Sequence, residues 1–282
     1  MSLIGFVYNA LVDDAPLLID SLVSSLDLRD RSWVSSAYDV AECEDRFENT
    51  SLIVVAGGDG TILRTVHSIA PYSIPVVAVN MGRVGFMSEL RVQEAEERLP
   101  FYLNGSVRVE RRMMLRAVVT DSKGSEVLRM DALNDVVLGR VGVAHLLDID
   151  TVVDGEFLTT YRADALVVST PTGSTGYALS AGGPIFFPEA LMMMLQPVAA
   201  HTGLRDGLVL PEDTEIILST GEDKEALVSV DGMEDVELRP GSRVRISRSP
   251  HEARFLRSKP RTAFYNELTR RLGLVYNLTP PS

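Results

Sequence analysis

A cluster of glycines around one aspartate could bind phosphate and accept a proton. Gly57, Gly58, Asp59, Gly60 and Thr61 follow a short apolar run and precede a helix-like segment. Glycine lets the backbone approach a ligand closely, and a helix N-terminus directs unpaired N–H groups outward. A carboxylate in such a turn repels phosphate unless it takes a proton from a nucleophile or holds a divalent cation. The turn therefore favours phosphoryl transfer, and the alternative is a tight βα turn whose aspartate accepts local amides.

Other phosphate and cofactor motifs do not fit this turn. No lysine of the chain lies in the Gly-Lys-Ser/Thr context of a Walker A loop. Reading G-x-G-x-x-G from Gly58 puts Leu63 where the last glycine belongs, which argues against a simple Rossmann oxidoreductase. The helix after the turn is expected over 61–70, with the Thr61 hydroxyl able to cap it.

A second candidate site is the hydroxyl-rich segment 169–184. It holds six serine or threonine side chains and four glycines within sixteen residues. Many neutral donors and free amides suit polyhydroxylated and phosphorylated ligands. The order Gly173-Ser174-Thr175-Gly176 does not match a nucleophile elbow. The alternative is a solvated turn, but the interleaved alanine, tyrosine and leucine favour a loop packed against something.

A third candidate is the pair Asn134-Asp135, just before a strand-like run. An amide beside a carboxylate can recognise an adenine edge and chelate a ribose diol. Taken alone, the pair is better explained as a turn cap.

The first hundred residues alternate strand-like and helix-like segments that would position the first site. Short apolar runs at 4–8, 52–56 and 75–79 are typical of buried strands, and 13–26 and 61–70 have helical periodicity. Continuous apolar strands alternating with helices indicate βαβ units and a parallel sheet that is covered on both faces.

From about residue 107 the pattern changes to many short β-rich runs. Pairs such as Asp154-Gly155 and Asp231-Gly232 are typical of hairpin turns between them. An amphipathic helix is expected over 261–272, with Phe264, Leu268 and Leu272 on one face.

Composition limits the class of protein. The 282 residues carry 27 basic and 39 acidic side chains, a net charge of −12, so neither nucleic acid nor an anionic membrane is expected as a partner. No apolar run approaches the roughly 18–20 residues that span a bilayer.

Because Arg29 is the first basic residue, no secretory signal is expected, and the single Cys43 fits a reducing cytoplasm. A metal here would be a hard cation held by oxygens and a ligand's phosphates.

In combination these stretches resemble the NAD kinase family over about residues 1–275. The hydroxyl-rich segment is the specific part, because diacylglycerol kinases and sphingosine kinases also carry the Gly-Gly-Asp-Gly-Thr turn, and phosphofructokinases carry a related form of it. The segments that carry the resemblance, in chain order, are Gly57–Thr61, Asn80–Phe86, Asn134-Asp135, Arg162-Ala163-Asp164 and Ser169–Pro184.

The resemblance implies an α/β N-terminal domain with a parallel sheet and a β-rich C-terminal domain, as in NAD and diacylglycerol kinases. The expected boundaries are 1–105 for the α/β domain, 106–250 for the dinucleotide-binding domain and 251–282 for a segment that packs back on the first. The implied activity is transfer of a phosphoryl group from ATP or polyphosphate, with Mg²⁺, to the 2′-hydroxyl of NAD. Homodimers or homotetramers are usual in this family.

The resemblance also assigns roles residue by residue. Asp59 falls on the catalytic aspartate and is the one candidate protein ligand of Mg²⁺. The residues expected at the phosphates are Gly57, Gly58, Gly60 and Thr61. Phe86 and Asn134 fall near adenine, Asp135 on the ribose hydroxyls, and Asp164 near the nicotinamide. The complete expected substrate-binding set is Gly60, Phe86, Asn134, Asp135, Arg162, Asp164, Thr175, Gly176, Tyr177 and Ser180.

The chain departs from the family pattern at three places. Asp135 stands where glutamate is usual, Gly176 stands where alanine is usual, and 197–207 lacks the familiar Pro-His and Arg-Pro pairs. We expect the backbone of Gly176 to lie in a region open to alanine. Two alternatives to an NAD kinase stay open: a lipid or sugar kinase sharing the turn, and a dinucleotide-binding regulator without catalysis.

Overall fold

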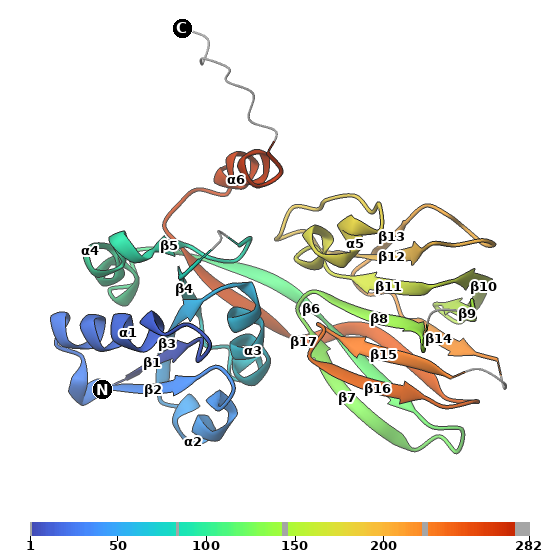
Figure 1. The fold of residues 1–282 in the computed structure, drawn as a ribbon, viewed down its shortest axis with the longest axis horizontal. Coiled ribbons are helices and arrows are strands. Elements are labelled where there is room, and N and C mark those ends of the chain that lie inside the picture. The colour runs from blue at the N-terminus through green and yellow to red at the C-terminus, as the bar shows by residue number, and fades with distance from the viewer. Residues whose placement is uncertain (1, 83–84, 143–145, 222–224, 274–282) are drawn as a thin grey trace, which may run out of the picture. The chain divides into compact units, whose positions relative to one another are not determined.

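The computed structural model describes residues 2–82, 85–142, 146–221 and 225–273 (Figure 1), so Arg83 and Val84 of the Asn80–Phe86 motif lie outside the described residues. The chain divides into two compact units. The first unit is Met1–Glu110 with Arg254–Ser282, and the second is Arg111–Ala253. Two long strands, β6 (Arg108–Thr120) and β17 (Arg243–Arg257), have residues in both.

The first unit has a parallel sheet in the order β2-β1-β3-β4, and β5 and the end of β17 also pair with β4. Its strands are β1 (Leu3–Tyr8), β2 (Ser32–Ser36), β3 (Thr50–Gly57), β4 (Val76–Asn80) and β5 (Leu90–Arg91). Its helices are α1 (Asp14–Ser25), α2 (Glu44–Phe47), α3 (Asp59–Ile69), α4 (Val92–Leu103) and α6 (Ala263–Arg271). The expected parallel α/β arrangement is confirmed.

The sheet of the first unit is buried on both faces, as its continuous apolar strands predict. On one face, Phe6 and Val54 pack in one cluster with Leu22 of α1 and Leu99 of α4. On β1, a side chain at Gly5 would meet the Trp33 ring at 2.4 Å, so the indole occupies the space that glycine leaves.

The order of strands reverses between β1 and β3. From β1 the chain moves to β2 on one side, whereas from β3 it moves through α3 to β4 on the other side. In such open sheets ligands bind outside the carboxyl ends of the strands where the order reverses. The Gly57–Thr61 turn lies at that end of β3 (Figure 1).

The second unit is antiparallel and β-rich, which confirms the expected fold class. Its strands are β7 (Glu126–Ala132), β8 (Asp135–Arg140), β9 (Leu147–Val153), β10 (Glu156–Ala163), β11 (Ala165–Ser169), β12 (Met192–Val198), β13 (Leu208–Pro211), β14 (Ile216–Thr220), β15 (Ala226–Val230) and β16 (Glu234–Leu238). One sheet has the order β13-β12-β11-β8-β15-β16, and β10-β9-β14-β17 pair in a second. Side chains of both sheets, such as Leu138 of β8 and Ile149 of β9, form one hydrophobic core.

Two hairpin turns of the second unit have the predicted conformation. Asp154 and Gly155 have φ of 49° and 84°, and Asp231 and Gly232 have φ of 51° and 64°. Successive left-handed residues match the twist of the flanking strands.

The predicted C-terminal helix is present as α6, but no residue of it is fully buried. Leu272, expected on its apolar face, is 38% exposed. Among the residues that the structure describes, no helix has the length and apolar character needed to cross a membrane.

Candidate functional site

The turn after β3 differs from its prediction in how the helix begins. Helix α3 starts at Asp59, Gly58 is its N-cap, and no side chain caps it. The prediction that Thr61 caps the helix is wrong, because the helix begins two residues earlier. The Thr61 side chain is 5% exposed and fills the space beside Gly57, where a Cβ would lie 2.3 Å from its hydroxyl oxygen. Thr61 therefore supports the turn from inside.

The outer side of this turn is open. A Cβ at Gly58 or Gly60 would meet no atom of the described residues within 4 Å. The amides of Asp59 and Gly60 are the first two of α3, and no acceptor within the described parts of the chain takes a hydrogen bond from either. Two free amides at a helix N-terminus, with open space in front of them, can bind an anion.

The Asp59 carboxylate is held in place by the loop after β4. The Phe86 N–H donates to one carboxylate oxygen at 2.8 Å, and the Met87 N–H donates to the other at 3.2 Å. The loop approaches so closely that a Cβ at Gly85 would lie 2.0 Å from Asp59 Oδ1. Only glycine fits at Gly85, and sequence reasoning missed this role although Gly85 lies within the Asn80–Phe86 motif.

A buried ionic network fixes this loop from behind. The Arg257 guanidinium donates to the Met87 carbonyl at 3.0 Å and pairs with Glu89 at 3.4 Å and Glu110 at 3.2 Å. The three charged side chains are 5–8% exposed. Burial acts to raise the pKa of Glu89, but the Arg257 charge and hydrogen bonds from Ser258 and Tyr102 bring it below its usual value. Removing one member would leave an uncompensated buried charge, so the network resists local movement.

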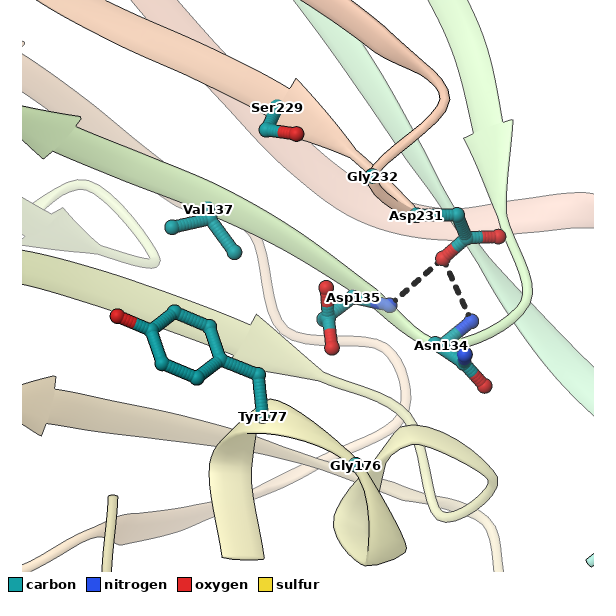
Figure 2. A pocket seen from close by; sticks show the side chains of 8 residues that line it. All are labelled: Asn134, Asp135, Val137, Gly176, Tyr177, Ser229, Asp231 and Gly232. Carbon is teal, nitrogen blue, oxygen red and sulfur yellow. Dashed lines mark hydrogen bonds between the residues drawn. The ribbon is translucent and has the colours of Figure 1, made fainter. Parts of the chain in front are cut away.

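In the second unit, Asp231 organises the Asn134-Asp135 pair (Figure 2). Its carboxylate accepts the amides of Leu133, Asn134 and Asp135 at 2.7, 2.8 and 2.9 Å. The turn is thus held by Asp231, and the pair does not cap it. Within the described residues, the side chains of Asn134 and Asp135 make no hydrogen bond to protein.

The pair lines a cavity of about 350 Å³, called the Asp135 cavity below, with Val137, Gly176, Tyr177, Ser229, Asp231 and Gly232. Asp135 is only 8% exposed. Burial, together with the negative charge of Asp231, raises the pKa of Asp135 to about 7. A carboxylate that loses water without gaining protein donors is suited to accept hydrogen bonds from a ligand's hydroxyls.

Most hydroxyls of segment 169–184 hold the loop itself. Thr170 donates to the Leu133 carbonyl, and the fully buried Ser174 donates to Pro171 O and accepts the Phe186 amide. The Thr175 and Ser180 hydroxyls turn back to carbonyls of their own loop, at 3.2 and 3.5 Å. The expected Gly176 and Tyr177 do reach the Asp135 cavity. The loop therefore offers a ligand fewer hydroxyl groups than its composition suggests.

Asp164 lines a second cavity of about 320 Å³, which shares Val137 and Tyr177 with the first. It forms a 2.8 Å ion pair with Arg140, which sequence reasoning did not foresee. Arg162 lines neither cavity. Its side chain is 57% exposed, with Nε 3.9 Å from Asp148.

The described residues contain no group of three or more histidine, cysteine, aspartate or glutamate side chains that could hold a metal. Mg²⁺ commonly binds through one or two carboxylates together with substrate phosphates. The only carboxylate that the turn itself contributes is Asp59.

A helix N-terminus with free amides beside a fixed carboxylate can hold phosphates next to a proton acceptor, and the separate cavity has a carboxylate for a ligand's hydroxyls, an arrangement that suits a phosphotransferase. Comparison with known proteins agrees. The model of the ATP-NAD kinase N-terminal domain matches residues 26–107, and that of the ATP-NAD kinase C-terminal domain matches 133–258.

Curated relatives are similar over nearly the whole chain. The chain is 37% identical over 270 residues to an NAD kinase of Dehalococcoides mccartyi (strain CBDB1), covering 95% of each chain. It is 37% identical over 271 residues to an NAD kinase of Gemmatimonas aurantiaca, covering 95% of this chain and 90% of the relative.

Two solved structures share the fold. Yeast NADH kinase complexed with NADH has a TM-score of 0.85 at 23% identity, covering 100% of this chain and 90% of that one. An NAD kinase from Archaeoglobus fulgidus in complex with ATP has a TM-score of 0.76 at 25% identity, covering 97% and 99%. The chain belongs to the NAD kinase family, and a lipid or sugar kinase is not favoured.

Proposed function

We propose that this enzyme transfers the terminal phosphoryl group of ATP to the 2′-hydroxyl of the adenosine ribose of NAD, giving NADP and ADP. The observation that carries the proposal is the Asp59 carboxylate, held by two loop amides beside two free amides of α3. The relative from Archaeoglobus fulgidus was solved with ATP and the yeast relative with NADH, which supports these two classes of substrate.

The second unit is proposed to bind the acceptor. Asn134 would recognise adenine and Asp135 would accept the ribose hydroxyls in the Asp135 cavity. The nicotinamide end would then lie toward Asp164, in the cavity that shares Tyr177. Phe86, Gly60, Thr175 and Ser180 stay in the proposed substrate site, although the last two hydroxyls are already engaged within their loop. Arg162 stays a prediction from the family pattern alone.

Asp59 is proposed to accept the proton of the attacking hydroxyl. Among the described residues, each of its oxygens receives one amide hydrogen bond, and a carboxylate oxygen has two lone pairs, so these bonds leave a lone pair on each. As the 2′-oxygen bonds to the terminal phosphorus, the bond from that phosphorus to the bridging oxygen breaks and ADP leaves with the electron pair. The free amides of Asp59 and Gly60, beside Gly57 and Gly58, would hold the phosphates.

A divalent cation fits this site only as one that arrives with the phosphates. Asp59 is the single carboxylate at the turn that could hold Mg²⁺, because the described residues form no larger acidic cluster there. When bound, Mg²⁺ would reduce the negative charge on the phosphoryl oxygens.

Four further properties are proposed from the family pattern and composition. Polyphosphate could replace ATP, because terminal phosphates are the only part of the donor that the α3 amides require. A homodimer or homotetramer and a cytoplasmic location are proposed, the latter because the chain has one cysteine, Cys43. With a net charge of −12, neither nucleic acid nor membrane is proposed as a partner.

The test is NADP formation by the purified protein. Incubation with Mg²⁺, ATP and NAD should yield a product that an NADP-specific dehydrogenase reduces, with one ADP formed per NADP. Parallel reactions without NAD, and with polyphosphate in place of ATP, identify acceptor and donor. ADP release without NADP, or no turnover with either donor, would refute the proposed function.

A further inference from the structure

The C-terminal helix α6 places an arginine against the loop that holds Asp59 in the first unit. The guanidinium carbon of Arg271 lies 4.4 Å from the ring centroid of Phe86, whose amide holds Asp59. The Arg271 side chain is only 9% exposed although it lies near the end of α6. A stacked, buried guanidinium is preorganised and loses little further freedom when it binds an anion.

Protein groups neutralise this cation only in part. Arg271 Nε lies 3.3 Å from a Glu267 oxygen, but it is buried and has no hydrogen-bond partner in the described chain. Glu267 also pairs with Arg270 at 2.7 Å and with Lys259 at 3.8 Å. One carboxylate is thus shared among three cations, which leaves the cluster with a positive balance.

Asp59 is the second acid that acts on Arg271. Burial is the main reason why the pKa of Arg271 lies below its usual value; the charges of Glu267 and Asp59 act to raise it, and those of Arg270 and Arg257 act to lower it. An arginine stays protonated in proteins, so this site keeps a permanent positive charge next to Asp59. No lysine lies in the turn, and Lys259 already contacts Glu267.

We propose that Arg271 is a catalytic residue that binds the terminal phosphates of the donor at the N-terminus of α3. The inference rests on the proposed function and adds a charged donor to the neutral amides of Asp59 and Gly60. As the terminal phosphoryl group passes from ATP to the 2′-oxygen, ADP leaves and the hydroxyl proton passes to Asp59, and negative charge spreads over the phosphoryl oxygens. The Arg271 guanidinium offers several N–H donors to those oxygens while Phe86 holds its plane.

The alternative is that Arg271 only holds α6 in place through Glu267. Arg270 is a matched control, because it neighbours Arg271 on α6 and bonds the same Glu267 oxygen, at 2.7 Å. If Glu267 pairing is what matters, Arg270→Gln and Arg271→Gln should have similar effects. If phosphate binding matters, only Arg271→Gln should impair catalysis.

The experiment compares wild type, Arg271→Gln, Arg271→Lys and Arg270→Gln by steady-state kinetics and by calorimetry with tripolyphosphate. Removing one fixed donor to transition-state charge typically costs about 10²- to 10³-fold, so Arg271→Gln should lose that much in kcat/KM for ATP. KM for NAD should stay within about twofold, and Arg270→Gln should match wild type within about twofold. Arg271→Lys should recover part of the activity, and tripolyphosphate affinity should fall only in Arg271→Gln.

Equal losses of kcat/KM for ATP in Arg270→Gln and Arg271→Gln would overturn the proposal, and so would an unchanged tripolyphosphate affinity in Arg271→Gln. Circular dichroism and thermal melting of each variant separate these results from misfolding, and partial recovery in Arg271→Lys is itself evidence of a folded enzyme. If the wild type makes no NADP, the proposed function fails, while the tripolyphosphate measurement still tests Arg271 by itself.

Discussion

Replacing Asp135 with asparagine should stabilise the ligand-free protein while weakening NAD binding. The carboxyl group is 8% exposed, lies near Asp231 and makes no protein hydrogen bond within the described residues. Asparagine keeps the shape of the side chain and carries no charge at any pH. The change therefore removes the cost of burying a charge and also the acceptor proposed for the ribose hydroxyls.

The size of the expected change in the free energy of unfolding follows from the raised pKa of Asp135. The pKa of Asp135 is about 7 in the folded protein, against 3.8 for an unperturbed group. Between these values the folded state binds the proton more tightly than the unfolded state, so the free energy of unfolding falls as pH rises from about 4 to 7. At about 1.4 kcal/mol per pKa unit, the cost is about 2 kcal/mol at pH 5 and about 4 kcal/mol at pH 8.

Urea unfolding at pH 5 and pH 8 measures this difference, with Asp235→Asn, an exposed carboxylate of β16, as control. Asp135→Asn should exceed wild type in stability by about 2 kcal/mol at pH 5 and about 4 kcal/mol at pH 8. Calorimetry at pH 8 should show NAD binding weakened by one or two charge-assisted hydrogen bonds, about 1.5–3 kcal/mol each. An equal stability difference at both pH values, or unchanged NAD affinity, would refute the reasoning.

Two glycine substitutions test the loops around the sites. Gly85→Ala places a Cβ 2.0 Å from Asp59 Oδ1 and should lower kcat about 10²-fold by displacing the carboxylate. A Cβ at Gly82 would meet no atom of the described residues within 4 Å, so Gly82→Ala should leave kcat unchanged in the same assay. Gly176 has a φ of −102° and a ψ of −126°, which is neither helical nor extended backbone, and its Cβ would lie 3.3 Å from the Gly173 carbonyl oxygen. This contact should offset the roughly 0.4–1 kcal/mol that Gly→Ala otherwise contributes. Thermal melts and KM for NAD should be nearly unchanged, and a lower melting point with a raised KM would show that the carbonyl cannot shift.

Local signals in the sequence predicted the elements that they determine directly. The apolar runs 52–56 and 75–79 became β3 and β4 because both faces of the sheet are covered. The Asp-Gly pair at 231–232 became a hairpin turn because both residues adopt positive φ. Helix α4 was missed, and its charged residues and Pro100 obscure the helical period.

The parts of the sites that depend on distant contacts could not be predicted. Asp231 accepts amides from Leu133 to Asp135, almost a hundred residues earlier in the chain. Arg257 similarly supports the loop that holds Asp59. The direction of the Ser174 hydroxyl, inward to Pro171 and Phe186, depends on the packing of the loop, which composition does not reveal.

The central claim is that Asp59 accepts the proton of the attacking hydroxyl, and turnover of Asp59→Asn tests it most directly. Asparagine keeps the size of the side chain but lacks the proton acceptor. A positioned general base contributes about 10²- to 10⁴-fold, so kcat for NADP formation should fall by that factor while the Kd for NAD stays within about threefold. Turnover close to that of the wild type, with NAD binding intact, would contradict the account.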